Sequence, residues 1–248
     1  MNKKLFLCIP VFFILYSVIF PCMTGTDYVL KQGIAGEKTD KTLPVTELSE
    51  NGRNVTLKDG NGKKIGSYRG DAPLTAADTS GNVTVLGFAD GRLAVSDSDH
   101  PFYELEYESP GNIEIIYSVS VSGDGKHIAA VAGLHPRKVI FFHRKHDRWV
   151  RGGSDEISDT HRRSTFIEFY DDILLFEDKG GITGINLADF NHFRLEFEGN
   201  LRKITYDSRS GIIYVHEGEN FRMYYNDGRL IAVVPDNGKS LDISLERG

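Results

Sequence analysis

The stretch SVSVSGDGKHIAAVAG, residues 118–133, decides the fold. Small polar and apolar residues alternate in its first half, the turn Gly123-Asp124-Gly125 follows, and a run of small apolar residues closes it. Alternation with a period of two is typical of a β-strand, and Asp-Gly between two such runs is a hairpin signal. The stretch therefore predicts a strand, a tight turn and a second strand.

Similar units recur along the chain, at residues 74–88, 166–178 and 204–218. Their starts lie roughly 35 to 50 residues apart, which is the period of a propeller blade. Each unit is followed by a second pair of strand-like runs, such as KVIFFHR and DRWVRGG after the first stretch. Four strands in each repeat predict an all-β chain folded as a β-propeller of about five four-stranded blades.

The turn SGDGKHIAAV, residues 122–131, resembles the turn between the first two strands in WD-repeat and related bacterial propeller families. The resemblance covers about residues 54–248 and is one of pattern. The Gly-His and Trp-Asp dipeptides of WD repeats are missing, since Val150 follows Trp149, so no subfamily is implied. A β-sandwich with irregular strand spacing is the alternative fold.

The two ends of the repeat region each match part of a blade. Residues 54–68 match a second hairpin, and residues 240–248, SLDISLERG, match a first strand. One explanation is circular closure, in which the last strand completes the first blade and protects its edge. The other is an incomplete or truncated propeller with an open edge. The sequence leaves both open.

The N-terminal segment is strongly apolar. Residues 5–23, LFLCIPVFFILYSVIFPCM, carry no charge and have about the ~20 residues that cross a bilayer. Lys3 and Lys4 before it place the N-terminus inside, so we expect a domain facing the periplasm or exterior of the cytoplasmic membrane. A retained single-pass anchor is favoured over a cleaved signal, because no small-residue cleavage pattern precedes Cys22. Cys22 is also a candidate lipidation site.

This reading divides the chain into three parts. Residues 1–25 form the membrane anchor or signal segment, residues 26–52 a polar stalk, and residues 53–248 the propeller-like domain. Both cysteines, Cys8 and Cys22, fall in the first part, so no disulfide can staple the domain.

Composition and motifs narrow the function classes. The net charge of -6 argues against general nucleic-acid binding, which requires a basic face. Metalloprotease, serine-hydrolase and phosphate-loop motifs are absent from the sequence, so we expect neither catalysis nor a cofactor. His135, His143, His146 and His161 lie close in sequence, but the spacing of His143 and His146 puts them on opposite faces of a strand. We expect no metal site.

One region departs from the acidic average. Between residues 137 and 163 the basic side chains outnumber the acidic ones by four. The candidate binding residues are Arg137, Lys138, Arg144, Lys145, Arg148 and the neighbouring Trp149. Such a surface suits an anionic partner, although a solvated hairpin is a simpler explanation of the same charges.

We therefore expect a membrane-tethered, non-catalytic module that binds an envelope protein or an anionic glycan or lipid surface. Two alternatives stay open. The first is a hydrolase or lyase of envelope polymers whose acidic or histidine residues converge only in three dimensions, and the second is a truncated remnant without retained function.

Overall fold

The computed structural model has nineteen strands among its described residues, and none of these residues lies in a helix. The described residues are 45–49, 51–59, 61–97, 100, 102–105, 115–133, 137–146, 148–157, 166–178, 181–198 and 201–235. The predicted anchor, Cys22 and the predicted strand at residues 240–248 lie outside these ranges. The chain divides into two compact units, residues 1–35 and 36–248, and every described strand belongs to the second.

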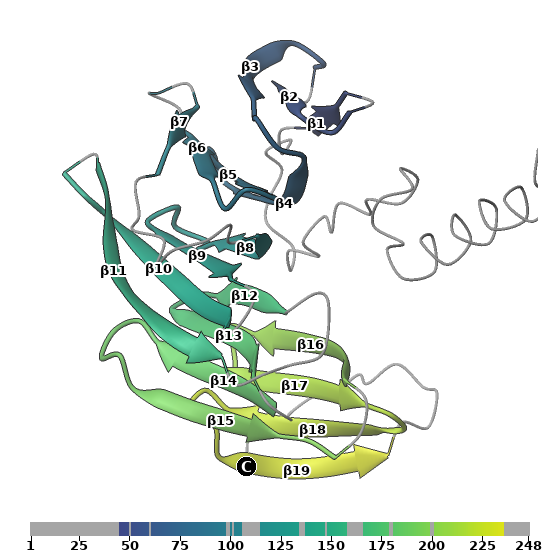
Figure 1. The fold of residues 1–248 in the computed structure, drawn as a ribbon. Coiled ribbons are helices and arrows are strands. Elements are labelled where there is room, and N and C mark those ends of the chain that lie inside the picture. The colour runs from purple at the N-terminus through teal and green to yellow at the C-terminus, as the bar shows by residue number, and fades with distance from the viewer. Residues whose placement is uncertain are drawn as a thin grey trace, which may run out of the picture. The chain divides into compact units, whose positions relative to one another are not determined.

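The strands form five antiparallel sheets, each built from consecutive strands (Figure 1). The first sheet has three strands, β1 (Val45–Leu48), β2 (Asn54–Lys58) and β3 (Lys64–Arg69). The second contains β4 (Leu74–Ser80), β5 (Val83–Phe88), β6 (Leu93–Ser96) and β7 (Tyr103–Glu104). The third contains β8 (Ile116–Val121), β9 (His127–Ala132), β10 (Arg137–Lys145) and β11 (Arg148–Ile157).

The last two sheets follow the same scheme. The fourth contains β12 (Ile167–Tyr170), β13 (Ile173–Asp178), β14 (Gly181–Asn186) and β15 (His192–Glu196), and the fifth contains β16 (Leu201–Asp207), β17 (Ile212–Glu217), β18 (Asn220–Tyr225) and β19 (Leu230–Pro235). The predicted four-strand repeat is confirmed. A β-sandwich is wrong, because it would pair strands of distant sequence across two sheets.

The first strand corrects the predicted domain boundary. β1 lies within residues 26–52, the predicted stalk, and pairs along its whole length with β2, from Val45 opposite Lys58 to Leu48 opposite Val55. Four residues with two charged or polar members give too short an alternation to stand out from a polar segment. The folded domain therefore includes residues from Val45 onward.

Apolar side chains fill each boundary between consecutive sheets, which we call a seam. Phe88 and Leu86 of the second sheet pack with Val55 of the first. One cluster joins Val85 to Ile128 and another joins Val131 to Leu174. Leu175 and Val215 belong to the cluster between the fourth and fifth sheets. The core is thus a series of layers, and each sheet buries side chains on both faces except where it ends the series.

Polar side chains tie the first strands of neighbouring sheets together. The Val121 N–H donates to Asp78 Oδ2 at 2.7 Å, and the Phe169 N–H donates to Ser120 Oγ at 3.2 Å. The Tyr170 hydroxyl donates to Glu168 Oε2 at 2.7 Å and also lies 3.3 Å from the Ile204 carbonyl of the next sheet. These bonds fix the lateral position of one sheet against the next, which apolar packing alone leaves free to slide.

Candidate binding site

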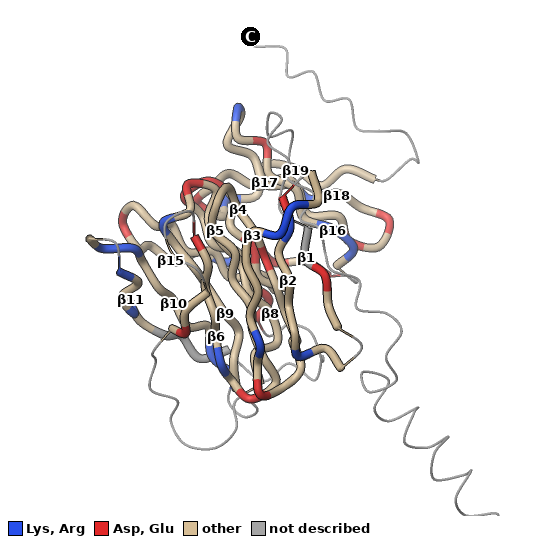
Figure 2. The backbone as a smooth tube through the Cα atoms, turned by 90° about the horizontal axis from the view of Figure 1, so that it is seen from above, with Lys and Arg blue, Asp and Glu red and all other residues tan. Residues whose placement is uncertain are grey.

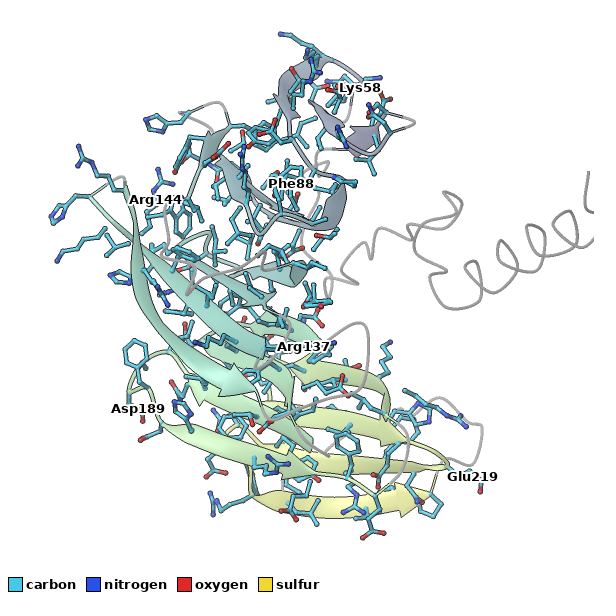
Figure 3. The ribbon with its side chains drawn as sticks, in the orientation of Figure 1. Lys58, Phe88, Arg137, Arg144, Asp189 and Glu219 are labelled. Atoms are coloured by element: carbon cyan, nitrogen blue, oxygen red, sulfur yellow. The ribbon has the colours of Figure 1, made fainter. Side chains whose placement is uncertain are left out.

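The six candidate basic-region residues do not form one surface. Arg137 and Lys138 begin β10, whereas Arg144 and Lys145 end it, roughly 20 Å away at the usual rise of a strand. Figure 3 labels Arg137 and Arg144 at these opposite ends. The Arg137 guanidinium lies over the Tyr117 ring, 4.3 Å from its centre. Only Arg144, Lys145, Arg148 and Trp149 gather at the turn between β10 and β11.

Arg144 acts as a brace, by which we mean a residue whose side chain holds the hairpin against another sheet of the same protein. Its side chain reaches the second sheet and lies 3.3 Å from Asp97 Oδ2, whose side chain is 1% exposed. His100 Nδ1 lies 3.1 Å from the other carboxylate oxygen of Asp97. Burial and the charge of Asp97 raise the pKa of the neighbouring Tyr103, and Arg144 lowers it in part. This ion pair holds the hairpin close to its turn, one residue before Lys145.

Trp149 is a second brace on the same face. It stands directly opposite Arg144 across the β10–β11 pair and packs against the cluster between the second and third sheets. A residue pair that is directly opposite shares a face of the sheet. Both candidates therefore point toward the second sheet and anchor the hairpin.

Lys145, His146 and Arg148 form the end of the hairpin, which we call the basic tip. Lys145 and Arg148 are exposed and directly opposite each other, so two like charges share one face. Within the described ranges neither has an ion-pair partner. His146 has a φ of 47°, which the tight turn imposes. Figure 2 shows Lys and Arg positions in blue on this hairpin.

An apolar surface lies beside the basic tip, on the face of the hairpin that is turned toward the fourth sheet. We call Phe141, Val150 and Phe190 the apolar ledge. Val150 is 40% exposed and stands opposite His143, the residue between Phe141 and Lys145 on that face. Phe190 is 60% exposed, and its ring meets the Phe141 ring edge to face at 6.4 Å between centres.

Phe190 has an unusual backbone for an aromatic residue. Its φ of 56° lies in the left-handed region, which costs a residue with a Cβ roughly 1–2 kcal/mol. The turn around it is closed by hydrogen bonds, from the Phe190 N–H to the Asn186 carbonyl at 2.8 Å and from the Asn191 N–H to Asp189 Oδ1 at 3.0 Å. Figure 3 labels Asp189 in this turn. The turn therefore holds an exposed ring in a fixed place.

Sequence reasoning missed Asp97, Val150 and Phe190. Asp97 lies 47 positions before Arg144 in the sequence, and their contact depends on how the second and third sheets pack. The turn Ala188-Asp189-Phe190-Asn191 did carry a signal, since an aromatic residue between two turn formers has no strand or core to join. No such signal surrounds Val150 in the sequence.

Buried carboxylates elsewhere are satisfied within the fold. Glu217, 3% exposed, pairs with Arg222 Nε and accepts the Glu198 N–H at 2.6 Å. Among the described residues no group of three His, Cys, Asp or Glu side chains is arranged to hold a metal ion. His135 and His161 lie outside those residues, as does the predicted anchor. Within the described ranges no helix is long and apolar enough to cross a membrane.

Comparison with known proteins supplies the family. A curated uncharacterized protein of Treponema pallidum (strain Nichols) is 33% identical over 93 residues, which are 38% of this chain and 25% of that protein. The matched part thus spans about a quarter of that relative's length.

Two solved structures are similar in fold. A functionally unknown protein from Desulfotomaculum acetoxidans DSM 771 has a TM-score of 0.55 at 11% identity, covering 79% of this chain and 67% of its own. A protein of unknown function from Bacteroides caccae has a TM-score of 0.48 at 10% identity, covering 80% and 74%. A family model described as a beta-propeller protein matches residues 31–234. The chain belongs to this family of β-propeller proteins.

Proposed function

We propose that this chain is a non-catalytic binding module that uses the end of its β10–β11 hairpin to hold an anionic partner in the cell envelope. The observation that carries the proposal is the combination of an ion pair that holds the hairpin close to its turn and a basic tip for which the described residues provide no ion-pair partner. Asp97 and Arg144 hold the hairpin from one side, and Lys145 and Arg148 stand exposed at its end.

The geometry of the hairpin supports recognition. β10 and β11 have nine and ten residues, the longest strands that the structure describes, and Figure 1 shows them extending as one curved pair. Two adjacent like charges repel each other, and a bound carboxylate or phosphate group would relieve that repulsion. Binding residues commonly lie on loops and hairpin ends held by a rigid scaffold.

The proposed location follows from residues 5–23. Their length and lack of charge support a tether in the cytoplasmic membrane, and Lys3 and Lys4 support a domain on its outer side. The partner would then be an envelope protein or an anionic glycan or lipid surface. Nucleic acid is not among the proposed partners, because the domain as a whole is acidic.

Crosslinking in the source cells tests the proposal. The tagged full-length chain is compared with the double variant Lys145→Glu/Arg148→Glu, and with Arg202→Glu/Lys203→Glu, which makes the same charge change on the exposed side of β16. We expect a crosslinked partner with the parent chain and the β16 variant, and at least a tenfold loss with the hairpin variant. Equal capture by all three chains would contradict a binding role for the basic tip.

A further inference from the structure

The outer edge of β11 is a long strand edge with main-chain groups on its open side. The strand order β11-β10-β9-β8 puts β11 at the edge of its sheet, and no described strand pairs with its other side. It has ten residues, whereas the edge strands β7, β15 and β19 have two, five and six. A long strand edge to which no described strand is added presents alternating N–H and C=O groups that can accept another strand.

The middle of β11 leaves room for a second backbone. Gly152 and Gly153 are both exposed, and a Cβ added at Gly153 would meet nothing within 4 Å. The register shifts between Phe141 and Phe142, so Gly152 is the extra residue of a β-bulge. A strand approaching this edge would meet no side chain at Gly153, whereas the Phe141 ring lies close to Gly152, 2.9 Å from where a Cβ would stand.

Side chains on one face of β11 set the chemistry of the incoming strand. Arg148 and Val150 are two residues apart and therefore point to the same side, toward the apolar ledge and the basic tip. A strand laid along β11 would place one side chain beside Val150, on the face that also carries Phe141, and the side chain two residues away beside Arg148 and Lys145. Because Arg148 and Lys145 are positively charged, we expect the second side chain of the added strand to be acidic.

We propose that β11 binds an extended segment of a partner protein by strand addition, with an apolar side chain on the apolar ledge and an acidic side chain, two residues away, at the basic tip. This rests on the proposed function, because both use the same hairpin end, and it names the partner as a peptide. The fixed Phe190 ring is the apolar anchor, and the main-chain hydrogen bonds provide the register.

A polysaccharide or a lipid headgroup would satisfy the cations but has no main chain to pair with β11. The test therefore compares probes by fluorescence anisotropy, or by competition for the labelled peptide, with the full-length chain in detergent micelles. The first peptide is Asp-Thr-Leu-Thr-Asp-Thr-Leu. The second has the same composition in an order that puts Asp and Leu on opposite faces, and the third is the first peptide N-methylated at alternate amides. Polygalacturonate provides charge without a peptide main chain, and poly-glutamate provides charge and a main chain without the apolar side chain.

We expect the first peptide to bind at least tenfold more tightly than the other four probes. Asparagine tolerates the left-handed backbone at position 190, so we expect the Phe190→Asn variant to fold. We expect this variant to bind the first peptide about tenfold more weakly and to bind poly-glutamate with unchanged affinity. Equal binding of the N-methylated peptide or polygalacturonate, or an unaffected Phe190→Asn chain, would overturn strand addition. If strand addition fails but the charged polymers bind, and the Lys145→Glu/Arg148→Glu variant loses that binding, the proposed function still holds. If no probe binds, strand addition is overturned, and capture in cells decides the proposed function separately.

Discussion

Arg144 and Lys145 are neighbours of like charge with different roles, and only their partners distinguish them. Arg144 meets Asp97 from the second sheet, whereas Lys145 stands at the exposed end of the hairpin. Sequence reasoning placed both in one basic surface because they lie in the same basic region of the sequence. Alternation along a strand predicts that they point to opposite faces, but it does not say what covers each face. The contact with Asp97 depends on how two sheets pack, which is a property of tertiary structure.

Replacing Arg144 tests its role as a brace. Arg144→Ala leaves the Asp97 carboxylate, 1% exposed, without its guanidinium. Removing one partner of a buried ion pair costs about 3–5 kcal/mol, and we expect about 2–3 kcal/mol here because Arg144 keeps some solvent contact and His100 remains. Urea unfolding of the variant, compared with Lys145→Ala as the control, measures the difference. A loss as small as that of Lys145→Ala, within about 0.5 kcal/mol, would show that the pair does not stabilise the hairpin.

The turn between β16 and β17 predicts a pH dependence. The Ser210 hydroxyl donates to Asp207 Oδ2 at 2.5 Å and the Arg209 N–H to Oδ1 at 3.1 Å, and these bonds lower the pKa of Asp207. The pKa of an unfolded Asp is about 3.9, and a lower pKa in the folded state stabilises the fold at pH values above it. This stabilisation is lost as the pH falls through the pKa of the folded state.

We expect Ser210→Ala to lower the free energy of unfolding at pH 7 by no more than about 1 kcal/mol, since the group is largely solvated. The difference from the parent chain should narrow as the pH falls below the unfolded pKa and through the lowered folded pKa of Asp207. Urea titrations across this range check it, with Ser208→Ala as a control of the same composition. A difference that stays constant with pH would exclude the carboxylate as its cause.

At the scale of elements, the seams depend on positions where only glycine fits. A Cβ on Gly87 of β5 would lie 2.4 Å from Ile116 Cγ2 of the next sheet. We expect Gly87→Ala to destabilise the fold by about 2–3 kcal/mol, because the side chain overpacks a closed boundary. Gly153→Ala on β11, where the added atom meets nothing, is the matched control and should change stability by less than about 0.5 kcal/mol. Thermal unfolding compares the two, and equal midpoints would contradict tight packing at this seam.

Most strands could be predicted because each hairpin carries its own signal. Alternation marks β8, and the turn glycine Gly125 has a φ of 67°, which glycine adopts at little cost. β1 was missed because it is four residues long and lies in a polar segment. The apolar ledge was missed for another reason, since Phe141 and Phe190 come from different sheets and meet only when those sheets pack. Local patterns predict elements, and sites that cross a seam require the structure.

At the scale of the whole molecule, the anchor is the part of the proposal that cell fractionation can check. We expect the full-length chain to remain with membranes after carbonate extraction, and Cys22→Ser to behave in the same way, because residues 5–23 suffice as a retained apolar anchor. Release of the Cys22→Ser variant into the soluble fraction would favour lipidation instead. Recovery of the parent chain in the soluble fraction would contradict a tether.

The pairing of every described strand with a neighbour in sequence has a consequence for how the chain folds. Each sheet is completed by residues that are adjacent along the polypeptide, and no described sheet waits for a strand from the far end. Chains dominated by such local pairings have low contact order and fold faster than β-proteins with distant pairings. A polypeptide that emerges from the ribosome N-terminus first can therefore complete one sheet and dock it on the previous one before the next has been synthesised.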